Sequence, residues 1–299
     1  MKPLLVVVSG PTAVGKTKLS VSLARHFSCS VISADSRQFY KELNIATAKP
    51  TFEEMEGVTH YFISQLSVYD YYNVSRFEQD VTSLFNKGII NTPVAILAGG
   101  SGLYTDAVCR GIDDIPDPDP GLRSQLIKEY EEKGPDGFLE FLKENDPDTF
   151  HQIDKRNKNR LIRAVETIKL TGKSLSEIRM QQFNPRPFRV LKIALNLPRN
   201  ELHQRINERT DQMIASGLVD EVRGLLPCRH LNALNTVGYK ELFVYLEGKC
   251  TLQEAVEKIK ANTRQYARRQ ITWLRRDKEY HWYHPEQKEE IIKLITESI

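Results

Sequence analysis

The sequence predicts an α/β fold, in which a parallel sheet is covered by helices and interrupted by a helical insertion. Short apolar, β-branched runs alternate with segments of helical period over the first hundred residues. Runs that are apolar on both faces are typical of strands buried on both sides of a parallel sheet. The strand pattern is missing between about 112 and 187 and then returns. With 299 residues, 40% of them hydrophobic, the chain can form a sizeable core and a smaller unit.

Strand and helix patterns follow one another in the first third of the chain. Apolar runs predict strands at 4–8 (LLVVV), 30–34 (SVISA) and 93–99 (PVAILAG). Helical spacing predicts helices at 16–27 and 74–89. Because ligands of such folds bind at the carboxyl ends of the strands, we expect the functional residues where these runs end.

The middle of the chain has helical periodicity and no strand signal. The stiff turn DDIPDPDPG opens this segment, and FNPRPF closes it. We therefore expect a core of residues 1–111 and 188–299, with a helical insertion domain at 112–187. After it come a strand at 189–197, the helical segments ELHQRINERTDQMIASG and LQEAVEKIKANTRQYARRQITWLRR, a short YHWYH strand and an amphipathic tail.

Composition and charge narrow the class of protein. No apolar stretch is long enough to span a membrane, and no cleavage pattern follows the first residues, so we expect a cytoplasmic protein with no membrane partner. The four cysteines are scattered and lack zinc spacing, which favours free thiols.

From residue 155 to 209, Lys and Arg strongly outnumber Asp and Glu. This charge indicates either a solvated helical surface or a nucleic-acid site.

A glycine-rich turn, GPTAVGKT, lies between the first strand and the first helix. It fits the phosphate-loop pattern G-x-x-x-x-G-K-[ST] in the required context, and so indicates a sheet like that of P-loop NTPases. Backbone N–H groups and the helix end would hold an anion, Lys16 would contact phosphate oxygens, and the Thr17 hydroxyl could bind a phosphate-bound Mg²⁺. The loop consists of Gly10, Pro11, Thr12, Ala13, Val14, Gly15, Lys16 and Thr17.

The phosphate loop predicts a di- or triphosphate ligand without naming it. Nucleotides such as ATP are possible, so kinases, NTPases and transferases that release diphosphate stay open. An NTPase would need an apolar strand ending in Asp near 90–100 to hold the metal. PVAILAGGSGLY instead ends in glycines and Ser101.

Asp35 follows the second predicted strand in VISADSRQFY. At the carboxyl edge of the sheet it would lie near the phosphate, where it could bind Mg²⁺ or accept a proton from a nucleophile. The alternative is a structural turn or N-cap aspartate. Arg37 and Gln38 beside it could contact a phosphate or a base edge.

Seven motifs follow one another between residue 4 and about residue 276: GPTAVGKT, ADSRQFY, IATAKP, AGGSGLY, NRLIRAVE, NTVGYKE and TRQYARRQITWLRR. This ordered set resembles the tRNA dimethylallyltransferase family. The resemblance implies attack of N6 of adenosine 37 on C1 of dimethylallyl diphosphate, with release of diphosphate, in tRNAs that read codons beginning with U. Like bacterial members of this family, the chain shows no zinc-finger pattern. We expect a monomer that binds the tRNA anticodon stem-loop and Mg²⁺.

The resemblance also implies roles for single residues. Asp35 would be the general base, Ser101 would help to hold the substrates, and Lys16 and the phosphate loop would hold the donor diphosphate together with Arg209. An alternative role for Arg209 is an ion pair on its own helix, for example with Glu208. The positions that match tRNA contacts are Asp35, Ser36, Arg37, Gln38, Ser101, Arg123, Asn159, Arg160, Leu161, Ile162 and Arg163. Further basic residues that could contact phosphates are Lys155, Arg156, Lys158, Arg264, Arg268, Arg269 and Arg275.

Three other functions stay open at this point. An adenylate isopentenyltransferase would prenylate free AMP, ADP or ATP with the same loop and aspartate. A P-loop kinase for a small molecule would transfer a γ-phosphate, and a noncatalytic RNA-binding protein would do neither.

Tyr239 and Tyr266 could stack on RNA bases or pack in the core.

Overall fold

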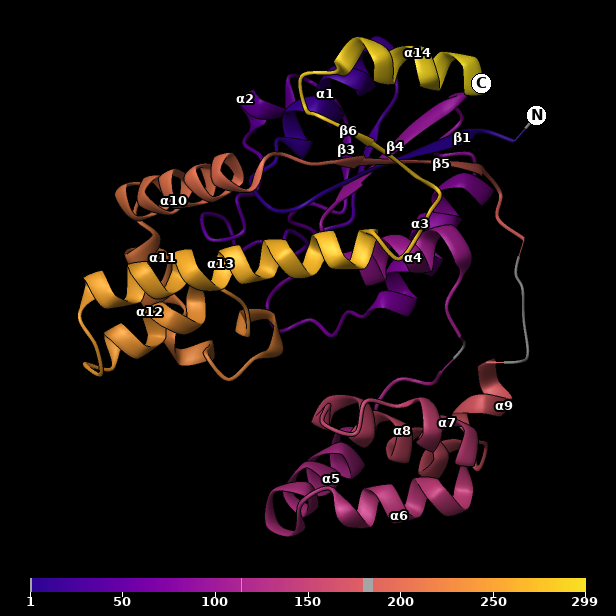
Figure 1. The fold of residues 1–299 in the computed structure, drawn as a ribbon, viewed down its shortest axis with the longest axis vertical. Helices are drawn as coiled ribbons and strands as arrows, with labels where there is room; N and C mark the ends of the chain where they lie inside the picture. The colour runs from indigo at the N-terminus through magenta and orange to yellow at the C-terminus, as the bar shows by residue number, and fades with distance from the viewer. Residues whose placement is uncertain (1, 114, 180–184) are drawn as a thin grey trace. The chain divides into compact units, whose positions relative to one another are not determined.

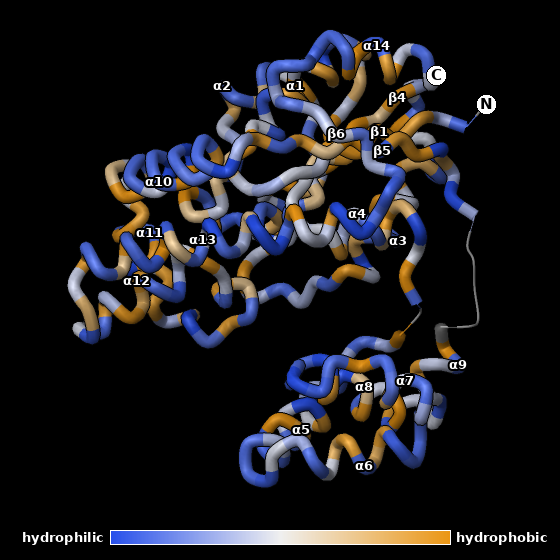
Figure 2. Tube along the Cα trace, in the orientation of Figure 1, coloured by the Kyte–Doolittle hydropathy of each residue, from blue (hydrophilic) through white to orange (hydrophobic). Residues whose placement is uncertain are grey.

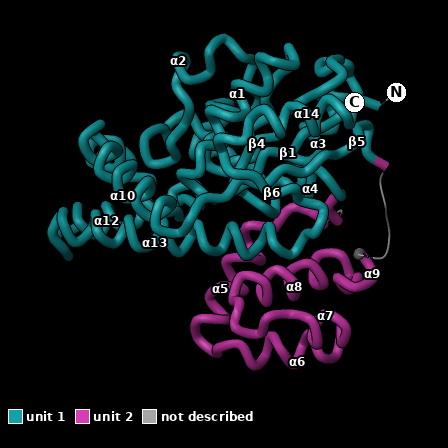
Figure 3. Tube along the Cα trace, turned by 45° about the horizontal axis from the view of Figure 1, so that its top comes forward, with its two compact units in different colours: residues 1–110, 186–299 teal, residues 111–185 magenta. Residues whose placement is uncertain are grey.

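The computed structural model describes residues 2–113, 115–179 and 185–299. The chain divides into two compact units, one of residues 1–110 and 186–299 and one of residues 111–185 (Figure 3). The boundaries expected from the sequence, 112 and 187, differ from these by one and two residues. Asp114 of the opening turn and Phe183 and Asn184 of the closing segment lie outside the described residues.

A six-stranded sheet forms the centre of the larger unit (Figure 1). Its strand order is β3-β2-β4-β1-β5-β6, and every neighbouring pair is parallel. The strands are β1 (Leu4–Ser9), β2 (Val31–Ser33), β3 (His60–Tyr61), β4 (Val94–Gly99), β5 (Arg189–Leu195) and β6 (Tyr280–Tyr283). The predicted α/β class and its five strands are confirmed. The two-residue β3 at the sheet edge was not predicted, because so short a strand leaves no periodic signal.

Helices cover both faces of the sheet. On β1, Leu4, Val6 and Val8 face one core and Leu5 and Val7 face the other, as expected when every second side chain points to the same side. The first core includes residues of α1 (Lys16–His26), α10 (Arg199–Ala215) and α14 (Lys288–Ser298). The second includes residues of α3 (Val74–Asn86) and α4 (Gly102–Arg110).

A group of helices extends this unit beyond the sheet. It contains α10, α11 (Leu218–Gly224), α12 (Tyr239–Leu246), α13 (Leu252–Leu274) and the short 3₁₀ helices Leu226–Cys228 and Asn232–Leu234. A capping box of Thr251 and Glu254 starts α13. The first part of α13 packs among these helices, whereas Leu274 at its end lies in a core of the sheet. Helix α13 therefore connects the helical group with the sheet (Figure 1).

The described part of the smaller unit is helical. Its helices are α5 (Pro120–Lys133), α6 (Asp136–Asn145), α7 (Pro147–Gln152), α8 (Lys158–Thr171) and α9 (Leu175–Arg179). Hydrophilic and hydrophobic segments alternate along them (Figure 2), and the apolar side chains form one core of their own. The side chains of Asp119, Asp146 and Asn157 cap α5, α7 and α8.

Two further structural findings concern the expectations from composition. Within the residues described, no helix is long and apolar enough to cross a membrane. The four cysteines are free thiols, and burial raises the pKa of Cys29 and Cys109 to about 12.

Candidate active site

The phosphate loop leaves β1 and ends where α1 begins. Gly15, at the start of α1, has φ +102°, a conformation that L side chains rarely adopt. A Cβ at Gly10 would lie 2.8 Å from the carbonyl oxygen of Leu195, so the loop passes too close to β5 for a side chain there. The glycines of GPTAVGKT are therefore required by backbone geometry at both ends of the loop.

Lys16 folds back over the phosphate loop. Its Nζ donates hydrogen bonds to the carbonyl oxygens of Gly10 and Pro11 at 3.0 and 2.9 Å. Burial lowers the pKa of Lys16 to about 8; the charge of Asp35 opposes this shift and that of Arg209 adds to it. The charges of Asp35 and Arg209 are therefore close enough to Lys16 to influence its ionisation.

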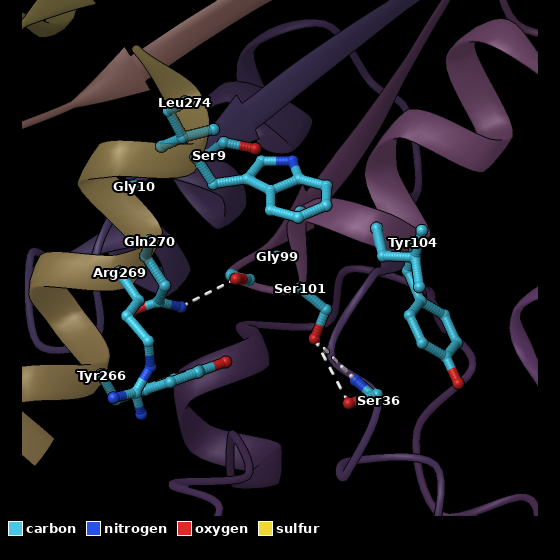
Figure 4. A pocket seen from close by; sticks show the side chains of 14 residues that line it. Ser9, Gly10, Ser36, Gly99, Ser101, Tyr104, Tyr266, Arg269, Gln270 and Leu274 are labelled. Carbon is cyan, nitrogen blue, oxygen red and sulfur yellow. Dashed lines mark hydrogen bonds between the residues drawn. The ribbon is translucent and has the colours of Figure 1, made fainter. Parts of the chain in front are cut away.

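Asp35 and Ser101 follow the neighbouring strands β2 and β4. The Ser101 hydroxyl accepts a hydrogen bond from the Ser36 amide at 3.2 Å and donates one to the Ser36 hydroxyl at 3.3 Å (Figure 4). One carboxylate oxygen of Asp35 accepts from the Arg37 amide at 2.9 Å. Asp35 therefore stabilises its own turn, as the structural alternative predicted, and also lines a cavity beside the phosphate loop.

Arg209 approaches the phosphate loop from α10. Its guanidinium donates a hydrogen bond to the Thr12 hydroxyl. Its helix neighbours have other partners, because Glu208 accepts from Gln204 and Arg205 pairs with Glu201. Arg209 therefore contacts the phosphate loop, whereas Glu208 accepts its hydrogen bond from a residue of its own helix.

Two cavities meet at these residues. One, of about 260 Å³, is lined mainly by small and aromatic residues of the β4 turn, α4 and α13. In Figure 4, Ser101 lies between Tyr266 of α13 and Tyr104 of α4. The other, of about 520 Å³, extends from Thr12, Asp35 and Arg209 toward the helical group. Both cavities are lined by Ser36, Tyr266 and Arg269. Asp35, which lines the larger cavity, and Ser101, which lines the smaller one, therefore face adjoining cavities.

A family described as IPP transferase matches residues 38–277. The chain belongs to this family. A tRNA dimethylallyltransferase 1 of Bacteroides thetaiotaomicron is 48% identical over 293 residues, which cover 98% of this chain and 95% of that protein. A tRNA dimethylallyltransferase 2 of Parabacteroides distasonis is 49% identical over 295 residues, 99% of each chain.

Solved structures of related enzymes have the same fold. The full-length tRNA isopentenylpyrophosphate transferase of Bacillus halodurans superposes with a TM-score of 0.72 at 36% identity, over 99% of this chain and 96% of that one. A eukaryotic dimethylallyltransferase, described as acting on tRNA, gives a TM-score of 0.76 at 28% identity, over 91% of this chain and 70% of that one. The family resemblance inferred from the motifs is thereby confirmed.

Several residues that line the site of this IPP transferase were not predicted individually. Gln270 and Trp273 of α13 line the smaller cavity, and the Trp273 indole donates to Asp106 at 2.8 Å. They belong to the motif TRQYARRQITWLRR, which supplied the family resemblance without a role for either side chain. Tyr266 lines both cavities, whereas Tyr239 is fully buried and its hydroxyl donates to Glu221 at 2.6 Å. Of the two alternatives for Tyr239, core packing is correct.

Gln38 of the IPP transferase is held by internal hydrogen bonds. Its amide nitrogen donates to the carbonyl oxygens of Thr47 and Ala48, both at 3.2 Å, and its oxygen accepts from Ser33 at 3.1 Å. Arg37 lines the larger cavity. Contact of either residue with RNA stays a prediction, and for Gln38 these bonds indicate a role in holding the loop.

The remaining positions that match tRNA contacts, Arg123 and residues 159–163, lie in the smaller unit. Asn159 and Arg160 are exposed on α8. Arg123 and Arg163 each donate to the buried carboxylate of Glu166 at 2.8 Å. Leu161 and Ile162 are 0% and 1% exposed in the core of this unit, which contradicts a tRNA contact by their side chains. They lie on the apolar face of α8, and the motif match did not distinguish the two faces.

Proposed function

We propose that this IPP transferase transfers the dimethylallyl group of dimethylallyl diphosphate to N6 of adenosine 37 in the anticodon stem-loop of tRNA. The observation that supports it most directly is the meeting of Thr12, Asp35 and Arg209 around one cavity, beside the Lys16 ammonium. This arrangement offers an anion-binding loop, two cations and a carboxylate at one place. The names of its close relatives agree with this activity.

The donor diphosphate would bind at the phosphate loop. Backbone N–H groups at the start of α1, the Lys16 ammonium and the Arg209 guanidinium can stabilise the charge that grows as diphosphate leaves. Arg209 suits this role because its planar group can donate two parallel hydrogen bonds. Such stabilisation acts on the bond that breaks, between C1 and the diphosphate oxygen.

The acceptor amine would lie near Asp35 and Ser101. The bond between N6 and C1 forms while the bond between C1 and oxygen breaks, and Asp35 accepts the proton that N6 loses. A carboxylate that holds its own turn through one oxygen is oriented for this transfer. The Ser101 hydroxyl, fixed by Ser36, can hydrogen-bond to the base.

Magnesium is proposed as the cofactor. No group of three or more His, Cys, Asp or Glu among the described residues could hold a metal ion, so the ion would be carried mainly by phosphate oxygens and water. Thr17 and Asp35, whose side-chain oxygens are of the kind that binds Mg²⁺, line one small cavity together with Lys16. When bound, Mg²⁺ would help to neutralise the leaving diphosphate, and the Thr17 hydroxyl would contact it.

Transfer of dimethylallyl to unmodified tRNA tests this function. Transfer to AMP at an equal rate would instead favour an adenylate isopentenyltransferase, and transfer or hydrolysis of the γ-phosphate of ATP would favour a P-loop kinase. The exposed basic residues of α8 and α13 support a tRNA partner. A monomer acting in the cytoplasm is part of the proposal, and sedimentation of the free protein would test the monomer.

A further inference from the structure

Gln270 of α13 connects two loops of the active site. Its side-chain oxygen accepts a hydrogen bond from the Thr12 amide at 2.8 Å, and its side-chain nitrogen donates one to the carbonyl oxygen of Gly100, also at 2.8 Å (Figure 4 shows the second bond). The residue is 7% exposed. A buried amide with both ends bonded is held in a single orientation.

The two loops carry different parts of the proposed reaction. Thr12 belongs to the phosphate loop and accepts a hydrogen bond from Arg209. Gly100 follows β4 and immediately precedes Ser101, which holds Ser36 beside Asp35. One side chain therefore ties the donor side of the site to the acceptor side, at a point beyond the ends of the strands where the sheet no longer fixes the spacing.

The fit around Gln270 leaves little freedom. A Cβ at Gly100 would lie 2.3 Å from the Gln270 nitrogen and 3.6 Å from the Lys16 ammonium. Gly100 therefore allows the amide and the lysine to approach the same turn. Since Gln270 accepts from the Thr12 amide, that N–H group is already bonded and is not available to the donor diphosphate.

We propose that Gln270 is a positioning residue that sets the distance between the donor diphosphate and the residues that receive the acceptor amine. The inference rests on the proposed transfer reaction. Gln270 would not touch the reacting atoms. Its loss would leave the diphosphate site nearly intact but would misalign the donor carbon with the amine, and misalignment affects turnover more than binding.

The test compares Gln270→Met, Gln270→Glu and wild type. Methionine has a similar length and removes both hydrogen bonds, whereas glutamate keeps the acceptor and loses the donor. Gln253→Met is the matched control, because Gln253 is an exposed glutamine on the same helix. For each protein one measures kcat and KM with dimethylallyl diphosphate and unmodified tRNA, the affinity for diphosphate by calorimetry, and the melting temperature.

We expect kcat to fall by about tenfold or more in both Gln270 variants, while the KM for tRNA and the diphosphate affinity stay within about threefold of wild type. Gln253→Met should behave as wild type. Wild-type kcat in both Gln270 variants would overturn the inference while leaving the transfer function intact. If Gln270 only stabilised the fold, its variants would have a lower melting temperature and an unchanged kcat per diphosphate-binding site. This result would also overturn the inference. Absence of transfer by the wild type would overturn both the function and the inference.

Discussion

The Arg209 guanidinium donates a hydrogen bond to the Thr12 hydroxyl, although 197 positions separate the two residues. Arg209 lies on α10, the helix that follows β5 along the chain, whereas Thr12 lies in the loop after β1. The parallel pairing of β1 with β5 brings the two segments together. The phosphate loop is thus completed by a cation from the last third of the chain, which a phosphate-loop motif alone does not supply.

Replacement of Arg209 by Lys should weaken both donor binding and turnover. Lysine keeps the charge but cannot donate two parallel hydrogen bonds to a diphosphate. We expect kcat/KM for dimethylallyl diphosphate to fall by about tenfold to a hundredfold, since a charge-assisted hydrogen bond contributes about 1.5–3 kcal/mol. Steady-state kinetics at saturating tRNA measures this. Arg205→Lys, on the same helix and paired with Glu201, should change kcat/KM less than twofold, and an equal loss in both variants would contradict the assignment.

Asp35→Asn should abolish most turnover without unfolding the site. Asparagine retains an oxygen that can accept from the Arg37 amide, so the turn is kept, but it cannot take the proton from N6. We expect kcat to fall by about 10² to 10⁴-fold with tRNA affinity nearly unchanged. Rapid-quench assays and filter binding report the two quantities.

Asp70→Asn is the control for Asp35, because Asp70 also accepts from a backbone amide in a turn, that of Ser67 at 2.7 Å. It should keep wild-type kcat. A Asp35→Asn variant with kcat within tenfold of wild type would rule out the general-base role and leave the turn as the main function of Asp35.

The affinity for diphosphate should fall as pH rises through the pKa of Lys16. Burial lowers this pKa to about 8, so the ammonium is charged below pH 8 and loses its proton above it, where it attracts the ligand less. Calorimetric titration with diphosphate between pH 6.5 and 9.5 measures the effect. Lys16→Arg stays charged over this range, so its affinity should lack the decline above pH 8. A decline of equal size in both proteins would assign the pH dependence to another group.

Local features of this chain were predictable from the sequence, and contacts between distant segments were not. The order of strand, GPTAVGKT and helix depends on neighbouring residues, and so does the position of Asp35 after β2. Gln270 gave no separate signal, because one glutamine in a basic amphipathic helix looks like a surface residue until the fold places Thr12 and Gly100 beside it. Family resemblance indicated Arg209, but its partner Thr12 came from the structure.

Two neighbouring residues of α8 test whether the smaller unit binds tRNA through its exposed face. Arg160 is exposed, whereas Leu161 is 0% exposed in the core of that unit. Arg160→Ala should raise the KM for tRNA severalfold, reduce the salt dependence of binding by about one phosphate contact, and leave the melting temperature unchanged. Leu161→Ala should instead destabilise the protein by about 2–5 kcal/mol. Binding measured at several salt concentrations, together with thermal denaturation, separates the two effects. If Arg160→Ala bound tRNA as the wild type does at every salt concentration, Arg160 would be excluded from the interface. If Leu161→Ala lost tRNA binding only to the extent that it unfolds, this would support the assignment of Leu161 to the core.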